Sequence, residues 1–194
     1  MKYKEHYDKW KDCTKCPLCS QRSKIVLARG TIPCDVCFIG EAPGESEDTL
    51  GQPFVGPAGK ILDSIIYEAG LMDSLDTPYA MTNLVACFPA DAKRDGINEP
   101  ERSEIKACEE RLREFITLCK PKLLVLVGSL AQQYVLAMNL RIRTAGIVHP
   151  AAILRAKIAQ QSMMRRKAVI TLANALERLQ SEPNYVEPDY KEPF

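Results

Sequence analysis

The fold depends on one stretch of sequence, Gly40-Glu41-Ala42-Pro43-Gly44-Glu45-Ser46-Glu47-Asp48, which continues after two residues as Gly51-Gln52-Pro53-Phe54-Val55-Gly56-Pro57-Ala58-Gly59. An apolar run of strand length, residues 36–39, precedes it, and residues 60–69 follow it with helical periodicity. Its five glycines let a backbone approach a ligand closely, and its three prolines fix the course of the chain. Because open α/β sheets bind ligands beyond the carboxyl ends of their strands, we predict a ligand site here. The alternative is a solvated connection in which the glycines only form turns.

The rest of the chain alternates between strand and helix patterns. Strands are predicted at residues 36–39, 79–87, 122–127 and 145–148, and helices at 57–70, 101–119, 129–138 and 162–179. This alternation predicts an α/β protein, a three-layer α/β/α sandwich with a central, mostly parallel four-stranded sheet. We expect residues 1–180 to form a single domain and residues 181–194, rich in proline, tyrosine and acidic residues, to form a flexible tail.

The composition is that of an ordinary globular protein, with 194 residues of which 46% are hydrophobic and 26% charged. No apolar run approaches the roughly 18 residues needed to cross a membrane, and the polar N-terminus differs from a secretory signal. We therefore expect a cytoplasmic protein, in which eight cysteines indicate metal binding or buried thiols rather than disulfides. The first residues, 1–12, are expected to form a short helix or arm in which His6 is solvated.

The formal net charge of +1 hides an uneven distribution. Residues 141–167 contain seven basic residues and no acidic ones, so the remainder of the chain carries 19 basic against 25 acidic residues. A basic block on a nearly neutral protein indicates a surface that faces a polyanion. The alternative is a solvated helix face.

Near the N-terminus, Cys13-Thr14-Lys15-Cys16 places two thiolates within reach of one metal ion or cluster. Cys19 follows at the same step. A continuous four-cysteine ferredoxin run needs another cysteine at position 23, where Ser23 stands, so a fourth ligand has to come from elsewhere in the chain.

Three later cysteines have their own interpretations. Cys34 and Cys37 repeat the two-residue spacing, but Cys37 falls inside a predicted strand. We interpret Cys37 as a core residue and Cys34 as a turn residue. Cys108 lies on the apolar face of the helix predicted at 101–119, where it can either join the core or face a cluster, and spacing does not decide between the two.

Polar residues stand at the ends of two predicted strands. Asn83 lies between apolar residues, and its amide offers a donor and an acceptor side by side, the pattern that reads a pyrimidine edge. The alternative is an asparagine that bonds its own backbone. His149 ends the last strand, with structural and catalytic roles equally open. Gly128-Ser129 opens a helix directly after a strand, a weak signal for anion binding.

Taken together and in order, these motifs resemble the uracil-DNA glycosylase superfamily, and within it the iron–sulfur-containing family 4. The resemblance runs over roughly residues 13–155. Its components are Cys13-x2-Cys16, Gly40-Glu-Ala-Pro-Gly44 with Glu47-Asp48, Gly51-x-Pro-Phe-Val-Gly56-x-Ala-Gly59, Thr82-Asn83-x-Val-x-Cys87-x-Pro89, Cys108, Gly128 and His149-Pro150-Ala-Ala-x-Leu-Arg155. Any one of these motifs is weak alone, but their common order is a strong signal.

The resemblance implies a pocket for a uracil nucleotide extruded from DNA. Phe54 would stack on the flipped base. Asn83 would accept a hydrogen bond from uracil N3–H and donate one to O4, a pattern opposite to that of cytosine. The loop residues Gly40, Ala42 and Gly44 would line the substrate site.

The resemblance also implies how the bond is cleaved. His149 would donate a hydrogen bond to uracil O2 and stabilise the charge that develops as the base departs. Glu41, with the backbone of the loop that follows it, would position the attacking water against a sugar with oxocarbenium character. Such an enzyme is monofunctional, leaves an abasic site and serves base excision repair. The chain has no histidine between His6 and His149, so we expect ordinary turnover rather than covalent trapping of uracil.

The implied DNA contacts lie near the end of the resemblance. Ile153 and Leu154 would fill the space that the extruded nucleotide leaves, while Arg155, its basic neighbours and Ser129 would contact phosphates. For Ile153 and Leu154 the alternative is the first turn of a buried helix. We expect a monomer that acts on uracil-containing DNA, single- or double-stranded, without a membrane partner.

The implied cofactor is a [4Fe–4S] cluster, held in an N-terminal cluster-binding segment by Cys13, Cys16, Cys87 and Cys108. Its expected role is structural. Cys19 is the chief rival for one ligand position, and a four-cysteine zinc site would satisfy the same spacing.

Three departures from the family pattern leave other functions open. The stretch between Gly128 and His149 is short, the gap between Cys87 and Cys108 is long, and the loop at 90–98 has an unusual composition. The alternatives are a DNA-binding member of the superfamily that does not cleave uracil and a glycosylase for another deaminated or modified base. A redox protein would need neither the asparagine nor the histidine.

Overall fold

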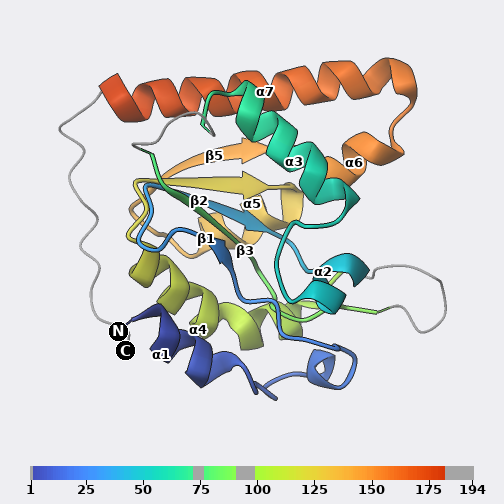
Figure 1. The fold of residues 1–194 in the computed structure, drawn as a ribbon, viewed down its shortest axis with the longest axis vertical. Helices are drawn as coiled ribbons and strands as arrows, with labels where there is room; N and C mark the ends of the chain where they lie inside the picture. Colours follow the sequence, from blue (N-terminus) through green and yellow to red (C-terminus); the bar gives the residue numbers. More distant parts are fainter. Residues whose placement is uncertain (1, 72–76, 91–98, 182–194) are drawn as a thin grey trace.

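The computed structural model describes residues 2–71, 77–90 and 99–181. At its centre lies a five-stranded sheet with the strand order β1-β3-β2-β4-β5 (Figure 1). The strands are β1 (Arg29–Gly30), β2 (Val36–Gly40), β3 (Tyr79–Asn83), β4 (Leu123–Val127) and β5 (Arg143–Ile147). β2 pairs in parallel with β3 and β4, and β4 with β5, whereas β1 pairs antiparallel with β3.

The prediction of a four-stranded sheet is wrong by one strand, β1. A strand of two residues is too short to show periodicity, and it forms only because the chain passes along the free edge of β3. The four predicted strands are all present and run parallel to one another, so the mostly parallel α/β class is confirmed.

Helices pack against both faces of the sheet (Figure 1). One face carries α4 (Arg102–Cys119) and α5 (Ser129–Ala137), with α1 (Tyr3–Trp10) packed against α4. The other face carries α3 (Pro57–Glu68), α6 (Pro150–Arg155) and α7 (Ile158–Ser181). The short elements η1 (Pro17–Ser20) and α2 (Glu45–Leu50) complete the chain.

The central strand β2 shows how one sequence serves both layers. All five of its residues are buried, which explains its unbroken apolar run. Cys37 and Ile39 belong to the core under α4 and α5, while Val36 and Phe38 belong to the core under α3 and α7. The interpretation of Cys37 as a core residue is therefore confirmed, and Cys34, just before the strand, is buried in the same core.

Several boundaries differ from the predicted ones. The loop after β2 contains α2, whose sequence is mostly polar and has no apolar stripe. β3 ends at Asn83 rather than at position 87, and α7 begins at Ile158, before its predicted start. Ser181 is the last residue of α7, and the rest of the predicted tail lies outside the described residues, as does most of the loop at 90–98. In the part of the chain that the structure describes, no helix combines the length and apolarity that a bilayer crossing requires.

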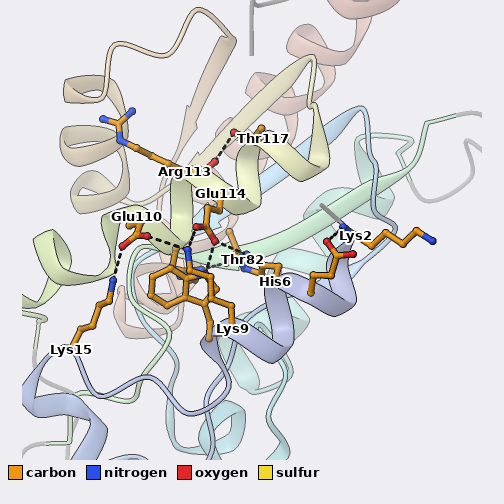
Figure 2. A network of polar contacts seen from close by, with 12 residues as sticks. Lys2, His6, Lys9, Lys15, Thr82, Glu110, Arg113, Glu114 and Thr117 are labelled. Atoms are coloured by element: carbon orange, nitrogen blue, oxygen red, sulfur yellow. Dashed lines mark hydrogen bonds and ion pairs between the residues drawn. The ribbon is translucent and has the colours of Figure 1, made fainter. Parts of the chain in front are cut away.

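The expectation that His6 is solvated is wrong. Its side chain is fully buried between α1 and α4, with its ring 5.9 Å from that of Phe115 and Nδ1 3.4 Å from Glu114 Oε2 (Figure 2). Glu114 also accepts hydrogen bonds from Trp10 Nε1, at 2.6 Å, and from Lys9 Nζ. The charged residues around His6 in sequence face solvent, while His6 and Trp10, four residues apart, share the buried face of α1.

Candidate active site

A cavity of about 380 Å³ lies beyond the carboxyl ends of β2 and β3. Six of the residues expected from the sequence line it: Ala42, Gly44, Phe54, Asn83, His149 and Leu154. Four of them come from loops that leave parallel strands, and the parallel register places Gly40 directly opposite Asn83. The topology thus gathers residues that are more than a hundred positions apart in the sequence.

The ring of Phe54 and the amide of Asn83 meet above Gly40. A Cβ atom at Gly40 would lie 2.4 Å from Phe54 Cζ and 2.5 Å from Asn83 Oδ1, so no other residue fits there without displacing one of them. Phe54 and Asn83 are 6% and 2% exposed, so both present their groups to the cavity from within the core. Gly40 does not line the cavity itself but allows the two side chains to converge.

The backbone of Phe54 is held in the left-handed region, with φ of 57°. Such a conformation is costly for a bulky residue and persists only where neighbouring contacts impose it. Here the carboxylate of Glu47 accepts hydrogen bonds from the N–H groups of Val55 and Gly56, at 2.9 and 2.7 Å. Arg29 donates to the carbonyl oxygen of Phe54 at 3.1 Å. Glu47 and Arg29 therefore set the position of the ring, a role that sequence reasoning did not assign to them.

Arg111 holds the backbone of Asn83 and its neighbours in place. The guanidinium is 1% exposed and donates to Thr82 Oγ1 at 2.8 Å, to Asn83 O at 2.5 Å and to Leu84 O at 2.8 Å. It thereby fixes the backbone where β3 ends. Sequence analysis missed this residue, although its position three residues after Cys108 and four before Phe115 lies on the apolar stripe of α4.

His149 is held as a neutral imidazole. Its Nδ1 accepts a hydrogen bond from the N–H of Ala151 at 3.2 Å, which leaves the proton on Nε2. Burial, and secondarily the charge of Arg155, lowers the pKa of His149 below its ordinary value. Gly128 leaves the space that the ring needs, because a Cβ there would lie 3.1 Å from His149 Cβ. The histidine can therefore offer a neutral N–H donor to the cavity.

Glu41 stands next to the cavity but is not among its lining residues. Burial, and secondarily the carboxylate of Glu99, raises the pKa of Glu41, while Arg155 lowers it. Because Arg155 acts on both Glu41 and His149, its charge lies within range of both groups. The backbone of Glu41 is fixed by a hydrogen bond from Val85 N–H, at 3.2 Å.

The residues expected to contact DNA differ in their exposure to solvent. Leu154 is 43% exposed at the rim of the cavity, and Arg155 and Ser129 are exposed as well. Ile153 is only 3% exposed and packs in the core with α3 and α7, so its expected insertion into DNA is wrong. Adjacent positions of a helix point about 100° apart, and α6 turns Ile153 inward when it turns Leu154 outward.

The four cysteines expected to bind a cluster lie in one region. Cys13 and Cys108 both pack against the small core of Trp10, Leu27 and Ala86, while Cys16 and Cys108 pack against the core that contains Cys87. Burial raises the pKa of Cys87 to about 11, and the Cys108 and Cys16 thiols add to this, while Arg22 opposes it. The guanidinium of Arg22 lies 3.1 Å from Cys87 Sγ.

The remaining four cysteines differ in burial. Cys34, Cys37 and Cys119 are buried in the core cluster that also contains Cys87, and all eight thiols are free. Cys19 is partly exposed, and its charge, like that of Cys13 and Cys87, acts on Arg22. Among the residues that the structure describes, no three His, Cys, Asp or Glu side chains are already arranged around a point where one metal ion would fit.

The model of the uracil DNA glycosylase superfamily matches residues 28–173, which is most of the chain. The chain therefore belongs to the uracil DNA glycosylase superfamily.

Relatives within that superfamily are named type-4 uracil-DNA glycosylases. The protein from Saccharolobus solfataricus is 36% identical over 142 residues, and that from Sulfurisphaera tokodaii 37% identical over 123 residues. These matches cover 73% and 63% of this chain but only 62% and 53% of the two relatives. The protein from Pyrobaculum aerophilum is 30% identical over 189 residues, covering 87% of this chain and 92% of the relative. Within the superfamily, the chain belongs to the type-4 family.

Proposed function

We propose that this protein is a uracil-DNA glycosylase, which hydrolyses the N-glycosidic bond of a flipped deoxyuridine and leaves an abasic site. The observation that carries the proposal is the convergence of Phe54, Asn83 and His149 on one cavity of about 380 Å³. An aromatic ring, an amide and a neutral N–H donor are the groups that a flipped pyrimidine requires. The names of the type-4 relatives support the same activity.

Phe54 and Asn83 would recognise the base. The ring of Phe54 offers a stacking face, and the Asn83 amide accepts from uracil N3–H and donates to O4. Cytosine has an acceptor at N3 and a donor at N4, so it would leave both buried polar groups unpaired. Because Gly40 carries no side chain, the ring and the amide can both lie close over it as walls of the cavity that receives the base.

His149 and Glu41 would promote cleavage of the glycosidic bond. As the bond between C1′ and uracil N1 breaks, its electron pair goes to the base, and the Nε2–H of His149 donates to O2, where the charge gathers. The Glu41 carboxylate and the backbone of the loop after β2 orient a water molecule, which adds its oxygen to C1′ and loses a proton to solvent. The released uracil anion takes up a proton from solvent. A neutral histidine suits this role because its Nε2–H can donate to O2 while its Nδ1 keeps the hydrogen bond that it accepts from Ala151 N–H.

Cys13, Cys16, Cys87 and Cys108 would hold a [4Fe–4S] cluster. Four cysteines converge without forming disulfides, and the guanidinium beside Cys87 suits a thiolate there. When bound, the cluster supplies four covalent links that tie the N-terminal segment to the loop after β3 and to α4.

The test is the release of free uracil from an oligonucleotide that contains one deoxyuridine. Replacing His149 with alanine should lower kcat by about 10²- to 10³-fold, the usual cost of removing a donor to a developing anion, with little change in KM. Wild-type protein that binds this DNA without releasing uracil would contradict the proposal and favour a non-cleaving DNA-binding protein. Release of another deaminated base, but not of uracil, would favour a glycosylase that acts on that base.

A further inference from the structure

A second cavity of about 500 Å³ opens at the C-terminal end of α2, whose N-terminal half lines the first cavity. Its walls are α1, the segment that follows η1, and the last residues of α2. Its volume is in the range of ligand sites, and it shares no lining residue with the cavity of Phe54 and Asn83. We call it the α2 groove.

The α2 groove combines positive charge with an exposed aromatic ring. Lys11, Arg22 and Lys24 line it, with Asp12 as the one acidic lining residue, and Tyr7 is 45% exposed on its α1 wall. Within the described ranges, Lys11 has one ion-pair contact, at 3.4 Å with Asp8, and Lys24 has none. Cations beside an exposed ring are the groups that bind a phosphodiester backbone and stack a base.

The helix α2 connects the two cavities through neighbouring carboxylates. Glu47 holds the N–H groups of Val55 and Gly56 in the loop that carries Phe54. The next residue, Asp48, accepts from Ser23 N–H at 2.8 Å and from Lys24 N–H at 3.3 Å, and so fixes the backbone of the groove wall. Because both carboxylates are buried in one helix, the two cavities keep a constant separation.

That separation suits a nucleic-acid strand. The six residues of α2 span about 9 Å at roughly 1.5 Å per residue. Nucleotides of one strand follow each other at about 3.4 Å along a B-DNA axis. A strand whose deoxyuridine enters the first cavity would therefore reach the groove about two or three nucleotides away.

We propose that the α2 groove binds the strand that flanks the extracted nucleotide, with Lys11 and Lys24 on its phosphates and Tyr7 stacked on a base. The inference rests on the proposed function, since it takes the first cavity as the site of the flipped base. It assigns to α1 and to the segment after η1 a part in DNA binding that neither their motifs nor the basic block at residues 141–167 indicated.

The proposal is tested by the salt dependence of binding to single-stranded DNA that carries 2′-fluoro-deoxyuridine, whose glycosidic bond resists hydrolysis. If Lys11 and Lys24 each neutralise one phosphate, the double variant K11Q/K24Q should reduce the slope of log K against log salt by about 1.4, at ~0.7 per contact. The matched control is Lys106→Gln, a lysine whose side chain is 79% exposed on α4, outside the groove. It should leave the slope unchanged.

A second pair of variants tests the stacking contact. Tyr7→Ala should weaken binding about 10-fold, whereas Tyr7→Phe, which keeps the ring, should bind as the wild type does. The difference in affinity between the wild type and Tyr7→Ala should vanish on an oligonucleotide that ends one nucleotide from the deoxyuridine on both sides. No flanking strand then reaches the groove.

The outcomes separate this proposal from the proposed function. An unchanged slope in K11Q/K24Q, in a protein that releases uracil, overturns the groove alone. A reduced slope in a protein that binds DNA but releases no uracil supports the groove and overturns the glycosylase activity. An equal loss of affinity in Lys106→Gln would show that general charge, rather than the groove, causes the effect.

Discussion

His6 and His149 are both held neutral, but for different purposes. His149 gives one nitrogen to Ala151 N–H and keeps the other for the cavity. His6 is fully buried, and among the described residues neither of its ring nitrogens has a hydrogen-bond partner, although Nδ1 lies 3.4 Å from Glu114 Oε2. Burial, and secondarily the charge of Arg111, lowers the pKa of His6 to about 4, although Glu114 opposes this. His149 thus serves the candidate active site, while His6 makes the stability of the fold depend on pH.

We predict that His6 destabilises the fold in acid. The unfolded chain takes up a proton near pH 6.5, whereas folded His6 does so only near pH 4. The titration of His6 therefore does not lower the free energy of unfolding above pH 6.5. As the pH falls from 6.5 to 4, it lowers the free energy of unfolding by up to about 3 kcal/mol. Denaturant unfolding across this range should show a flatter pH dependence for His6→Leu than for the wild type. Equal slopes would contradict the assignment of the proton to His6.

At the scale of single elements, α4 connects three regions through one face. Cys108, Arg111 and Glu114 follow each other at intervals of three residues, so they share a side of the helix. Cys108 faces the N-terminal cysteines, Arg111 holds the end of β3, and Glu114 binds α1. Figure 2 shows Glu114 from this face with Lys9 and His6 below it. A helix whose periodicity indicates a core element thus also positions the candidate site.

We predict that Arg111→Met is much more costly than Arg113→Met. The first change leaves the buried carbonyl groups of Asn83 and Leu84 without a donor and should lower the unfolding free energy by about 3 kcal/mol. Arg113 is 42% exposed and pairs with Glu109 on the surface, so its loss should cost less than about 1 kcal/mol. Thermal unfolding provides the comparison.

A second measurement distinguishes loss of charge from loss of packing. Because the charge of Arg111 lowers the pKa of His6, that pKa should rise in Arg111→Met and stay constant in Arg113→Met. NMR titration of the imidazole would detect the change. Similar losses of stability in both variants, with no change at His6, would refute the role of Arg111.

At the scale of the whole molecule, the N-terminal segment depends on contacts that are distant in sequence. It reaches the rest of the protein through Trp10 and Glu114, through Asp48, which holds residues 23 and 24, and through the four cysteines. A cluster bound there would join three parts of the chain that the sheet does not connect. We therefore expect its loss to loosen the N-terminal segment and the end of β3 together.

We predict that Cys108→Ala loses both the iron and the brown chromophore and lowers the melting temperature, whereas Cys19→Ala keeps all three. Cys108 lies among the other three proposed ligands, while Cys19 is near Arg22 at the margin of the group. Iron analysis and visible absorption of the purified variants would decide. The opposite pattern would give Cys19 the fourth ligand position.

The local patterns of the sequence were enough for the α/β class and for the positions of the four main strands along the chain. Continuous apolar runs mark strands that are buried on both faces, and this property is carried by each segment alone. The same is true of the loop after β2, whose glycines and prolines reflect the close approach of Phe54 and Asn83 over Gly40. The candidate site was therefore readable as a set of motifs.

Only the tertiary structure decided which residues face each other. The two-residue strand β1, the burial of His6 and of Ile153, and the support of Asn83 by Arg111 depend on packing between segments far apart in the chain. A charged residue in a helix looks the same in sequence whether water or a buried carbonyl group receives its hydrogen bonds. Burial and pairing are properties of the assembled layers, and for this reason the motifs identified the family and its expected site residues while the supporting contacts emerged only from the fold.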